Sequence, residues 1–299
     1  MPEFFVPLLK NVDRVLELVL PGATLNGVAR LKGGVSADVH RLDIRLADGS
    51  PYRAVLRVHG ETHCGHSAHL EFQLLEALFR SGLPVPRPIG FGEDAERLGH
   101  PYVLIDFVEG SSEINAQKLE TCIGKMAEML AAVHRTRTAE LPSLPLRMDP
   151  FPELLEFLGR DDAWLGLRIR LTKLDDTAYT GTPVLLHGDF WPENLIWSDG
   201  RIAAILDWED AAVGDPLSDV ACTCLELRYL FGDRGIRAFK NAYARHGRID
   251  QGRLSLWLLY VAAAALKHMG DWGLAPSREA NMRREAKETL RQAALDLLG

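Results

Sequence analysis

Hydrophobic and polar positions in the first hundred residues follow the period of strands and then that of a helix. After a first amphipathic helix, residues 27–58 alternate as about three strands with turns at residues 33–34 and 48–50. Residues 67–83 then repeat leucines at helical spacing and end at a Ser-Gly pair. These leucines share one helix face: Leu70, Leu74, Leu75 and Leu78. A small sheet with a packed helix is predicted.

The pattern changes again further along the chain. Three prolines in PVPRPIGFGE (84–93) forbid a helix, so this segment is expected to be extended or looped. PYVLIDFV (101–108) is predicted to be a buried strand. From about Ala116 onward almost everything is predicted to be helical, except a β-hairpin within residues 185–208 that turns at residues 198–200. The expected fold class is α+β, with a small mixed β-sheet lobe followed by a mainly α-helical lobe.

Composition supports two lobes in an ordinary globular chain. The 299 residues are 47% hydrophobic and 25% charged, and the expected division is residues 1–108 and 109–299. A formal net charge of -7 argues against a nucleic-acid partner bound through phosphate neutralisation. Four scattered cysteines and no apolar run long enough to span a bilayer favour a soluble, cytoplasmic protein without a membrane partner.

The chemistry is concentrated in residues 185–210, LLHGDFWPENLIWSDGRIAAILDWED. Asp189 and Asn194 share a loop, and folding of the hairpin is expected to bring Asp207 back beside it. One amide and one carboxylate oxygen, from Asn194 and Asp207, suit Mg²⁺, which takes few protein ligands together with water and phosphate oxygens. Asp189 would accept the proton of a substrate hydroxyl, and His187 would hold the loop by hydrogen bonds.

A metallohydrolase is the competing interpretation of the same residues. His187, Asp189 and Asp207 could bind a transition metal if further ligands came from elsewhere. The tract HGETHCGHSAH, from His59 to His69, offers imidazoles, although a polar loop entering a helix is the favoured interpretation. A nucleotide clamp in the first lobe would decide for a phosphotransferase.

The motifs resemble those of the aminoglycoside phosphotransferase and choline kinase-like family, relatives of the protein kinases. HGDFWPEN resembles the catalytic loop of that family, and ILDWEDAAVGDPLSDVA its metal-binding aspartate followed by a helix start. The resemblance runs in order from about Ala29 to Ala221. It implies a two-lobed protein-kinase-like fold with a nucleotide bound between the lobes.

The resemblance also implies roles for single residues. Asp189 resembles the catalytic base, within a loop that includes His187. Asn194 and Asp207 resemble the Mg²⁺ ligands. Asp219 resembles a structural aspartate that caps backbone donors of the catalytic loop, which is compatible with a simple position near a helix start.

The first lobe carries the matching nucleotide clamp. LKGGVSADVHRLDI resembles the loop over the phosphates, in which Gly33 and Gly34 permit close approach and Ser36 adds a donor. Arg57, in YRAVLRV, stands where protein kinases and many relatives have lysine, and it is not equivalent to lysine. Glu71 resembles the helix glutamate that pairs with this cation.

The strand PYVLIDFV resembles the segment that joins the lobes, where backbone groups of Asp106, Phe107 and Val108 would bind a purine. The implied enzyme is a small-molecule kinase that transfers the γ-phosphate of ATP or GTP to a hydroxyl. An aminoglycoside-like antibiotic or another hydroxylated metabolite is ranked above macrolide, choline, ethanolamine or homoserine acceptors. Trp191 and Glu209 adjoin the catalytic positions and are candidate substrate contacts. A catalytically idle nucleotide-binding regulator remains a further alternative.

Overall fold

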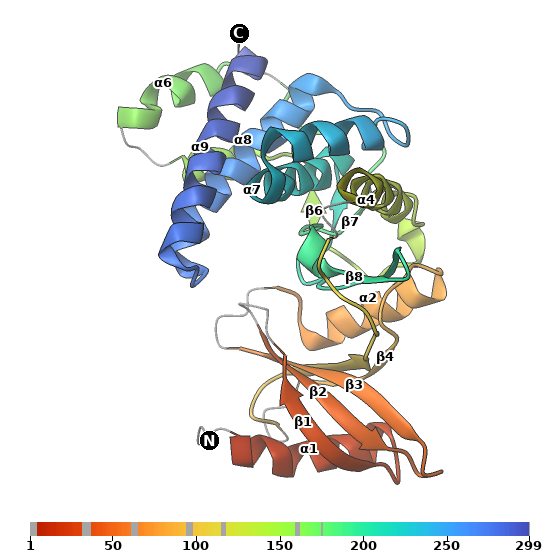
Figure 1. Cartoon of the computed structure of the whole chain (residues 1–299). Helices are drawn as coiled ribbons and strands as arrows, with labels where there is room; N and C mark the ends of the chain where they lie inside the picture. Colours follow the sequence, from red (N-terminus) through yellow and green to blue (C-terminus); the bar gives the residue numbers. More distant parts are fainter. Residues whose placement is uncertain are drawn as a thin grey trace. The chain divides into compact units, whose positions relative to one another are not determined.

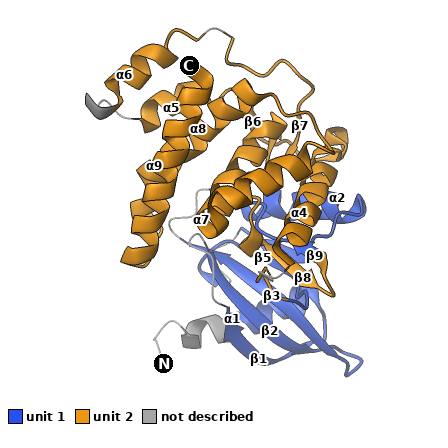
Figure 2. Ribbon diagram, turned by 45° about the horizontal axis from the view of Figure 1, so that its top comes forward, with its two compact units in different colours: residues 1–110, 203–209 blue, residues 111–202, 210–299 orange. Residues whose placement is uncertain are grey.

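The computed structural model describes residues 5–31, 37–60, 65–93, 98–114, 118–158, 162–174 and 176–298. The chain divides into two compact units, coloured separately in Figure 2: unit 1 comprises residues 1–110 and 203–209, and unit 2 comprises residues 111–202 and 210–299. The sequence did not indicate that residues 203–209, which follow the catalytic loop by a few residues, group with the N-terminal part of the chain.

Unit 1 is built on one five-stranded sheet with the strand order β1-β2-β3-β5-β4 (Figure 1). Every pairing in this sheet is antiparallel, so the expectation of a mixed sheet is corrected in this respect. The elements of unit 1 are α1 (Phe5–Val19), β1 (Thr24–Arg30), β2 (Ala37–Arg45), β3 (Pro51–His59), α2 (Ala68–Arg80), β4 (Pro88–Gly92) and β5 (Tyr102–Asp106).

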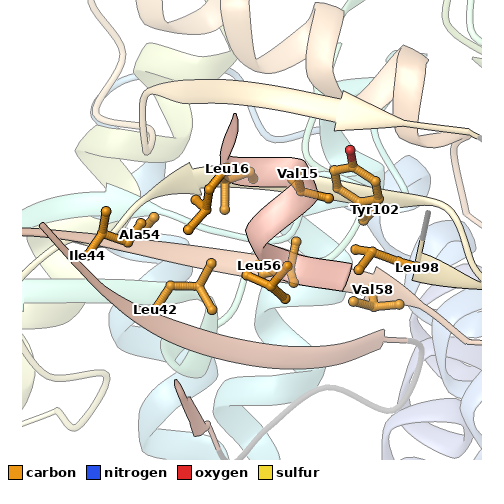
Figure 3. Close-up of a cluster of buried hydrophobic side chains, with 11 residues drawn as sticks. Val15, Leu16, Leu42, Ile44, Ala54, Leu56, Val58, Leu98 and Tyr102 are labelled. Atoms are coloured by element: carbon orange, nitrogen blue, oxygen red, sulfur yellow. The ribbon is translucent and has the colours of Figure 1, made fainter. Parts of the chain in front are cut away.

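A hydrophobic core joins α1 to one face of this sheet. Val15 and Leu16 of α1 pack with Leu56 at the centre of β3 (Figure 3). Because side chains alternate along a strand, Arg57 and His59 of β3 share the opposite face from Leu56. Ala54, Leu56 and Val58 thus anchor β3 in the core, while the two polar residues are presented on the other side.

Helix α2 supplies the acidic partner for that polar face. It begins after Ser67, whose Oγ accepts a hydrogen bond from the backbone N–H of Leu70 at 3.2 Å. Leu74, Leu75 and Leu78 are buried, as the helical spacing predicted, and α2 contacts β4 and β5. Glu71, in the first turn, is buried as well.

The segment 203–209 is held in unit 1 by backbone hydrogen bonds. The N–H of Ile205 donates to the carbonyl of Pro84 at 2.7 Å, and the N–H of His66 donates to the carbonyl of Glu209 at 3.1 Å. Trp208 is buried, and its Nε1 donates to the carbonyl of Ile205 at 3.2 Å. These contacts fix the backbone that carries Asp207.

Unit 2 is mainly helical, as predicted. A three-stranded sheet with the order β6-β10-β7 was not predicted, because its strands are two or three residues long. β8 and β9 form the predicted hairpin, with Asp199 and Gly200 at positive φ in its turn, although the last three residues of β9 are counted in unit 1. The elements are α4 (Leu119–His134), η2 (Thr138–Glu140), β6 (Leu146–Arg147), α5 (Phe151–Phe157), α6 (Asp162–Leu171), β7 (Val184–Leu186), η3 (Pro192–Asn194), β8 (Leu195–Ser198), β9 (Arg201–Ile205), β10 (Ala212–Gly214), α7 (Pro216–Tyr243), α8 (Gln251–His268), η4 (Met269–Asp271) and α9 (Pro276–Leu298).

Two hydrophobic clusters hold the helices of unit 2 together. One joins α5 and α6 to α8 and α9, and the other joins α7 to α8 and α9. The apolar run Leu254–Leu266 lies within α8, as expected of a buried helix. In the described part of the chain, no helix is both long enough and apolar enough to cross a membrane.

Candidate active site

The catalytic-loop motif lies between β7 and β8 in unit 2 and is held by hydrogen bonds to side chains of α7. Asp219, in the first turn of α7, is fully buried. Its carboxylate accepts hydrogen bonds from the backbone N–H groups of His187 at 2.8 Å and of Gly188 at 2.9 Å. The carboxylate therefore holds the two residues that precede Asp189.

The Asp219 carboxylate has a further partner behind it. His134 Nε2 lies 3.1 Å from Asp219 Oδ2, and His134 Nδ1 lies 2.7 Å from the Tyr243 hydroxyl. Burial by itself would raise the pKa of Asp219, but the hydrogen bond and charge of His134 together with those of His187 outweigh it, so the pKa of Asp219 lies below its ordinary value. Asp219 is therefore an ionised, fully hydrogen-bonded anchor at neutral pH.

Gly188 allows the sharp bend that leads to Asp189. Its φ is +88°, and a Cβ added at this position would lie 2.2 Å from the carbonyl oxygen of Asp210. Both the backbone angle and the close approach exclude a side chain. The motif His-Gly-Asp thus has a glycine where the backbone requires one.

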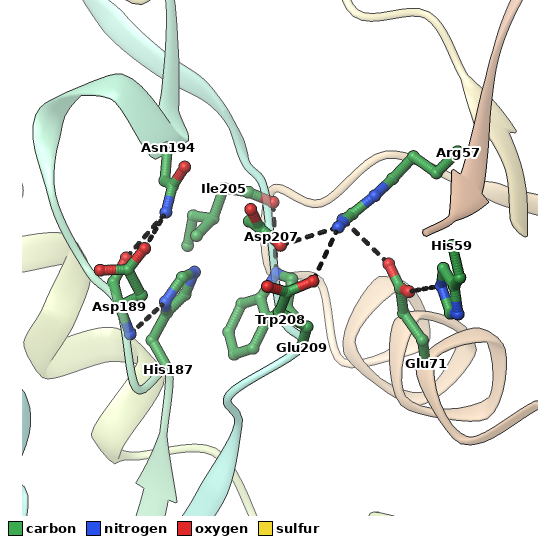
Figure 4. A network of polar contacts seen from close by, with 10 residues as sticks. All are labelled: Arg57, His59, Glu71, His187, Asp189, Asn194, Ile205, Asp207, Trp208 and Glu209. Carbon is green, nitrogen blue, oxygen red and sulfur yellow. Dashed lines mark hydrogen bonds and ion pairs between the residues drawn. The ribbon is translucent and has the colours of Figure 1, made fainter. Parts of the chain in front are cut away.

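The side chain of Asp189 is oriented by neutral donors (Figure 4). Asn194 Nδ2 donates to both the carbonyl oxygen and Oδ2 of Asp189, at 2.9 Å each. The N–H of Asp189 donates to His187 Nδ1 at 3.2 Å, which places the imidazole proton on Nε2. Cys222 Sγ of α7 lies 3.9 Å from Asp189 Oδ1.

These bonds also orient Asn194 itself. Because its amide nitrogen is turned toward Asp189, its carbonyl oxygen Oδ1 points elsewhere, and among the described residues it has no hydrogen-bond partner. That oxygen is suited to a metal ion.

Two residues of α7 beside Asp189 were missed by sequence reasoning. Asp219, Cys222 and Glu226 follow one another at i, i+3 and i+7 on one face of α7. Glu226 is half-buried, and burial followed by the charge of Asp189 raises the pKa of Glu226 to about 8. The helical spacing from Asp219 was the signal that could have found both residues.

The phosphate-binding cation expected on β3 lies within a group of carboxylates in unit 1 (Figure 4). Arg57 Nη1 is 3.0 Å from Glu71 Oε1, and Arg57 Nη2 is 2.8 Å from Asp207 Oδ1 and 3.5 Å from Glu209 Oε2. His59 Nε2 lies 3.2 Å from the other oxygen of Glu71. The ion pair between Arg57 and Glu71 that the resemblance implied is present, and Glu209 is a further carboxylate beside Arg57.

The charges in this group determine the state of Arg57. Burial would lower the pKa of Arg57, but attraction to Glu71, Asp207 and Glu209 outweighs it and raises that pKa above its ordinary value. The side chain of Asp207 is 26% exposed, compared with 1% for Glu71, so Asp207 is the partner that a ligand can reach. Asp207 has a φ of +62°, a left-handed conformation that aspartate tolerates better than most residues.

The backbone predicted to bind a purine is partly engaged within the sheet. The N–H of Asp106 donates to the carbonyl of Arg87 at 2.9 Å, and the N–H of Phe107 donates to the carbonyl of Arg53 at 3.2 Å. Val108 is the member of this trio whose N–H has no partner within the described ranges. The Asp106 carboxylate pairs with Arg87 Nε at 3.0 Å.

The remaining predicted residues are placed as follows. Gly33, Gly34 and Ser36 lie outside the described residues, as do His63 and Cys64 of the histidine-rich tract. His59 contacts Glu71, and the ring of His69 stacks on Phe91 with centroids 5.0 Å apart. Within the described ranges, no group of three or more His, Cys, Asp or Glu side chains is arranged to hold a metal ion. Trp191 is half-buried immediately before η3.

Comparison with known sequences gives a family and several relatives. The sequence model of the phosphotransferase enzyme family matches residues 27–257. Acyl-CoA dehydrogenase family member 10 of Mus musculus is 26% identical over 186 residues, which cover 54% of this chain and 17% of that protein. The aminoglycoside 3'-phosphotransferase of Streptomyces fradiae is 26% identical over 208 residues, which cover 63% of this chain and 76% of that protein. The chain therefore spans about a fifth of the length of the acyl-CoA dehydrogenase family relatives.

Solved structures share the fold. A protein of Ralstonia eutropha assigned as an aminoglycoside phosphotransferase has a TM-score of 0.73 and 16% identity, covering 96% of this chain and 97% of that one. A macrolide 2'-phosphotransferase of type I has a TM-score of 0.62 and 19% identity, covering 98% and 96%. At these identities the likeness establishes the protein-kinase-like fold alone. The α+β prediction is thereby confirmed, and the family match over most of the chain shows that it belongs to the phosphotransferase enzyme family.

Proposed function

We propose that this chain is a small-molecule kinase that transfers the γ-phosphate of ATP or GTP to a hydroxyl group. The observation that carries the proposal is the arrangement around Asp189. Its backbone is fixed through Asp219, and its carboxylate is oriented by the Asn194 amide at 2.9 Å. A carboxylate held by neutral donors is suited to accept the proton of an acceptor hydroxyl and to orient that hydroxyl.

Asn194 and Asp207 are the proposed ligands of Mg²⁺. Among the described residues, Asn194 Oδ1 and Asp207 Oδ2 each have no hydrogen-bond or ion-pair partner, and both are the hard oxygen atoms that Mg²⁺ prefers. When bound, Mg²⁺ would neutralise negative charge on the phosphate oxygens. Arg57 would bind phosphate oxygens while Glu71 keeps its guanidinium in place, and the N–H of Val108, unpaired among the described residues, would bind the purine.

The acceptor is proposed to be a hydroxylated small molecule, with an aminoglycoside-like compound first. A relative with most of its length matched is named an aminoglycoside 3'-phosphotransferase, which supports this order. The acyl-CoA dehydrogenase names belong to much longer proteins of which this chain matches about a fifth, so no dehydrogenase activity is proposed. Trp191 remains a proposed substrate contact because it adjoins the loop that carries Asp189.

The test is nucleotide consumption with Mg²⁺ across a panel of aminoglycosides, macrolides, amino alcohols and sugars. Each assay is paired with Asp189→Asn, which keeps the size of the side chain but cannot accept the proton, and with the exposed control Asp296→Asn on α9. We expect stimulation by one acceptor class, lost by at least a hundredfold in Asp189→Asn and kept in the control. Nucleotide binding without any transfer would support the regulator alternative, and full transfer by Asp189→Asn would refute the assigned base.

A further inference from the structure

Helix α7 is bonded to the catalytic loop on both sides of Asp189. On the side that precedes Asp189, the Asp219 carboxylate accepts from two backbone N–H groups at 2.8 and 2.9 Å. On the side that follows it, the Thr223 hydroxyl donates to the backbone carbonyl of Phe190 at 2.7 Å. Asp219 and Thr223 are four residues apart, so they are neighbours on one face of the helix. One helix face therefore carries both attachments of the loop.

The bond from Thr223 is made in the interior of unit 2. Thr223 and Phe190 are both fully buried. The Phe190 ring also meets the imidazole of His187 edge to face, with ring centroids 5.7 Å apart. Among the described residues, the Thr223 hydroxyl is the partner that the Phe190 carbonyl has. Because a buried carbonyl without a donor is costly, this hydroxyl fixes the direction in which the loop leaves Asp189.

Thr223 acts differently from the side chains that contact Asp189 directly. Asn194 donates to the carboxylate and to the carbonyl of Asp189, and His187 accepts from its N–H. Cys222 Sγ lies 3.9 Å from Asp189 Oδ1, and a thiol is a weak donor. These side chains act on Asp189 itself, whereas Thr223 holds the backbone of the next residue from a buried position on α7.

We propose that Thr223 is a positioning residue for phosphoryl transfer, because its hydroxyl holds the Phe190 carbonyl and thereby keeps Asp189 where it meets the acceptor hydroxyl. This inference rests on the proposed kinase function and extends it to a fully buried residue that the acceptor does not touch. Phosphoryl transfer depends mostly on positioning, and displacing a reacting group by about 1 Å can cost about a hundredfold in rate. The bond beside Asp189 therefore acts on the rate of transfer.

The test removes the hydroxyl and keeps the branched shape of the side chain. In Thr223→Val we expect kcat to fall about ten- to a hundredfold. The KM of the acceptor and the Kd of AMP-PNP with Mg²⁺ should change by less than about twofold, since the residues proposed to bind them are unaltered. Thr223→Ser keeps the hydroxyl and should retain most of the kcat of the unaltered protein.

Thr289 provides a matched control within unit 2. It lies on α9, is buried, and its Oγ1 has no hydrogen-bond partner among the described residues. Thr289→Val therefore makes the same chemical change without removing a bond, and it should keep kcat. Urea unfolding of every variant sets assay conditions under which each is folded.

Hydrogen–deuterium exchange of the unliganded full chain follows the loop without turnover. Peptides that cover residues 187–191 should exchange faster in Thr223→Val than in the unaltered protein, because the loop opens more often when the Phe190 carbonyl is not held. Thr223→Ser and Thr289→Val should exchange as the unaltered protein does.

Each outcome decides the proposal. A fall in kcat confined to Thr223→Val, with KM kept and with faster exchange of the loop, supports it. An unchanged kcat or an unchanged exchange in that variant overturns it. A parallel loss of kcat, nucleotide affinity and stability also overturns it, because Thr223 would then only hold the fold together. If the unaltered protein transfers phosphate to no acceptor of the panel, the proposed function fails and the inference fails with it, whereas an active protein with an equally active Thr223→Val refutes the inference alone.

Discussion

Replacing Asp219 by asparagine should destabilise unit 2 strongly although the two side chains have the same size. The carboxylate is fully buried and accepts from two backbone N–H groups at 2.8 and 2.9 Å, with His134 at 3.1 Å. The amide of asparagine offers one accepting oxygen and one donating nitrogen. One of the N–H groups, of His187 or Gly188, would then face another donor in a fully buried site.

The magnitude can be worked from these contacts. A hydrogen bond to a charged group contributes about 1.5–3 kcal/mol, and a buried donor left unsatisfied costs a similar amount. We therefore expect Asp219→Asn to lower the free energy of unfolding by about 2–4 kcal/mol, a large part of the roughly 5–15 kcal/mol of a typical domain. The exposed Asp296→Asn, whose only described partner is Gln292, should change it by less than about 0.5 kcal/mol.

Urea unfolding followed by tryptophan fluorescence measures the difference in unfolding free energy, and its signal comes mainly from unit 2. Five of the six tryptophans belong to unit 2, and Trp208 alone belongs to unit 1. Turnover should fall with stability, because the same hydrogen bonds hold the backbone before Asp189. A loss of less than about 1 kcal/mol would refute the assignment of Asp219 as the anchor of the loop.

The stability that Asp219 contributes should depend on pH, because the contribution requires an ionised carboxylate. The folded-state pKa of Asp219 is below its ordinary value, so its contribution is present at neutral pH and is lost as the pH falls through that folded pKa. The difference in unfolding free energy between the protein and Asp219→Asn should therefore be constant from about pH 5 to pH 7 and shrink in acid, below about pH 4. A difference independent of pH down to pH 2 would contradict an ionised anchor.

Two other positions give independent tests. Gly188→Ala places a Cβ at 2.2 Å from the carbonyl of Asp210 and should cost about 3 kcal/mol or more and abolish transfer, whereas Gly200→Ala, also at positive φ but with open space, should cost about 1–2 kcal/mol in urea unfolding. Glu226, with a pKa raised to about 8, holds its proton in the folded state, so the protein should lose stability as pH rises toward 8. Glu226→Gln cannot titrate and should gain roughly 1–3 kcal/mol relative to the unaltered protein between pH 6 and pH 9, and a constant difference would contradict the raised pKa.

The main elements were predictable because they follow local rules. The alternation in β2 and the leucine spacing in α2 are visible in short windows, and both elements formed where expected. The strands β6, β7 and β10 could not be predicted, because two or three residues carry no period. The grouping of residues 203–209 with unit 1 depends on contacts such as that of Ile205 with Pro84, whose partners lie far apart in the sequence.

The chemistry of the loop was easier to predict than its surroundings. His187, Asp189 and Asn194 are neighbours in sequence, so their spacing fixes how they meet. Cys222 and Glu226 come to Asp189 because α7 continues along the loop, which only the fold specifies. Glu209 was predicted to contact the substrate because it lies two residues after Asp207, and that role stays a prediction. Its contact with Arg57 depends on the fold and was not predicted.

The charged residues proposed for catalysis have different kinds of partner in the two units. In unit 2, the donors on Asp189 from Asn194 and Cys222 are neutral, and burial together with Asp189 raises the pKa of the Cys222 thiol so that it stays protonated. Such donors orient a carboxylate without cancelling the charge that a proton acceptor needs. In unit 1, the guanidinium of Arg57 lies within 3.5 Å of carboxylate oxygens of Glu71, Asp207 and Glu209. Under the proposed function, the carboxylates of unit 1 would hold Arg57 in place for a nucleotide phosphate, and Asp189 of unit 2 would act on the acceptor hydroxyl.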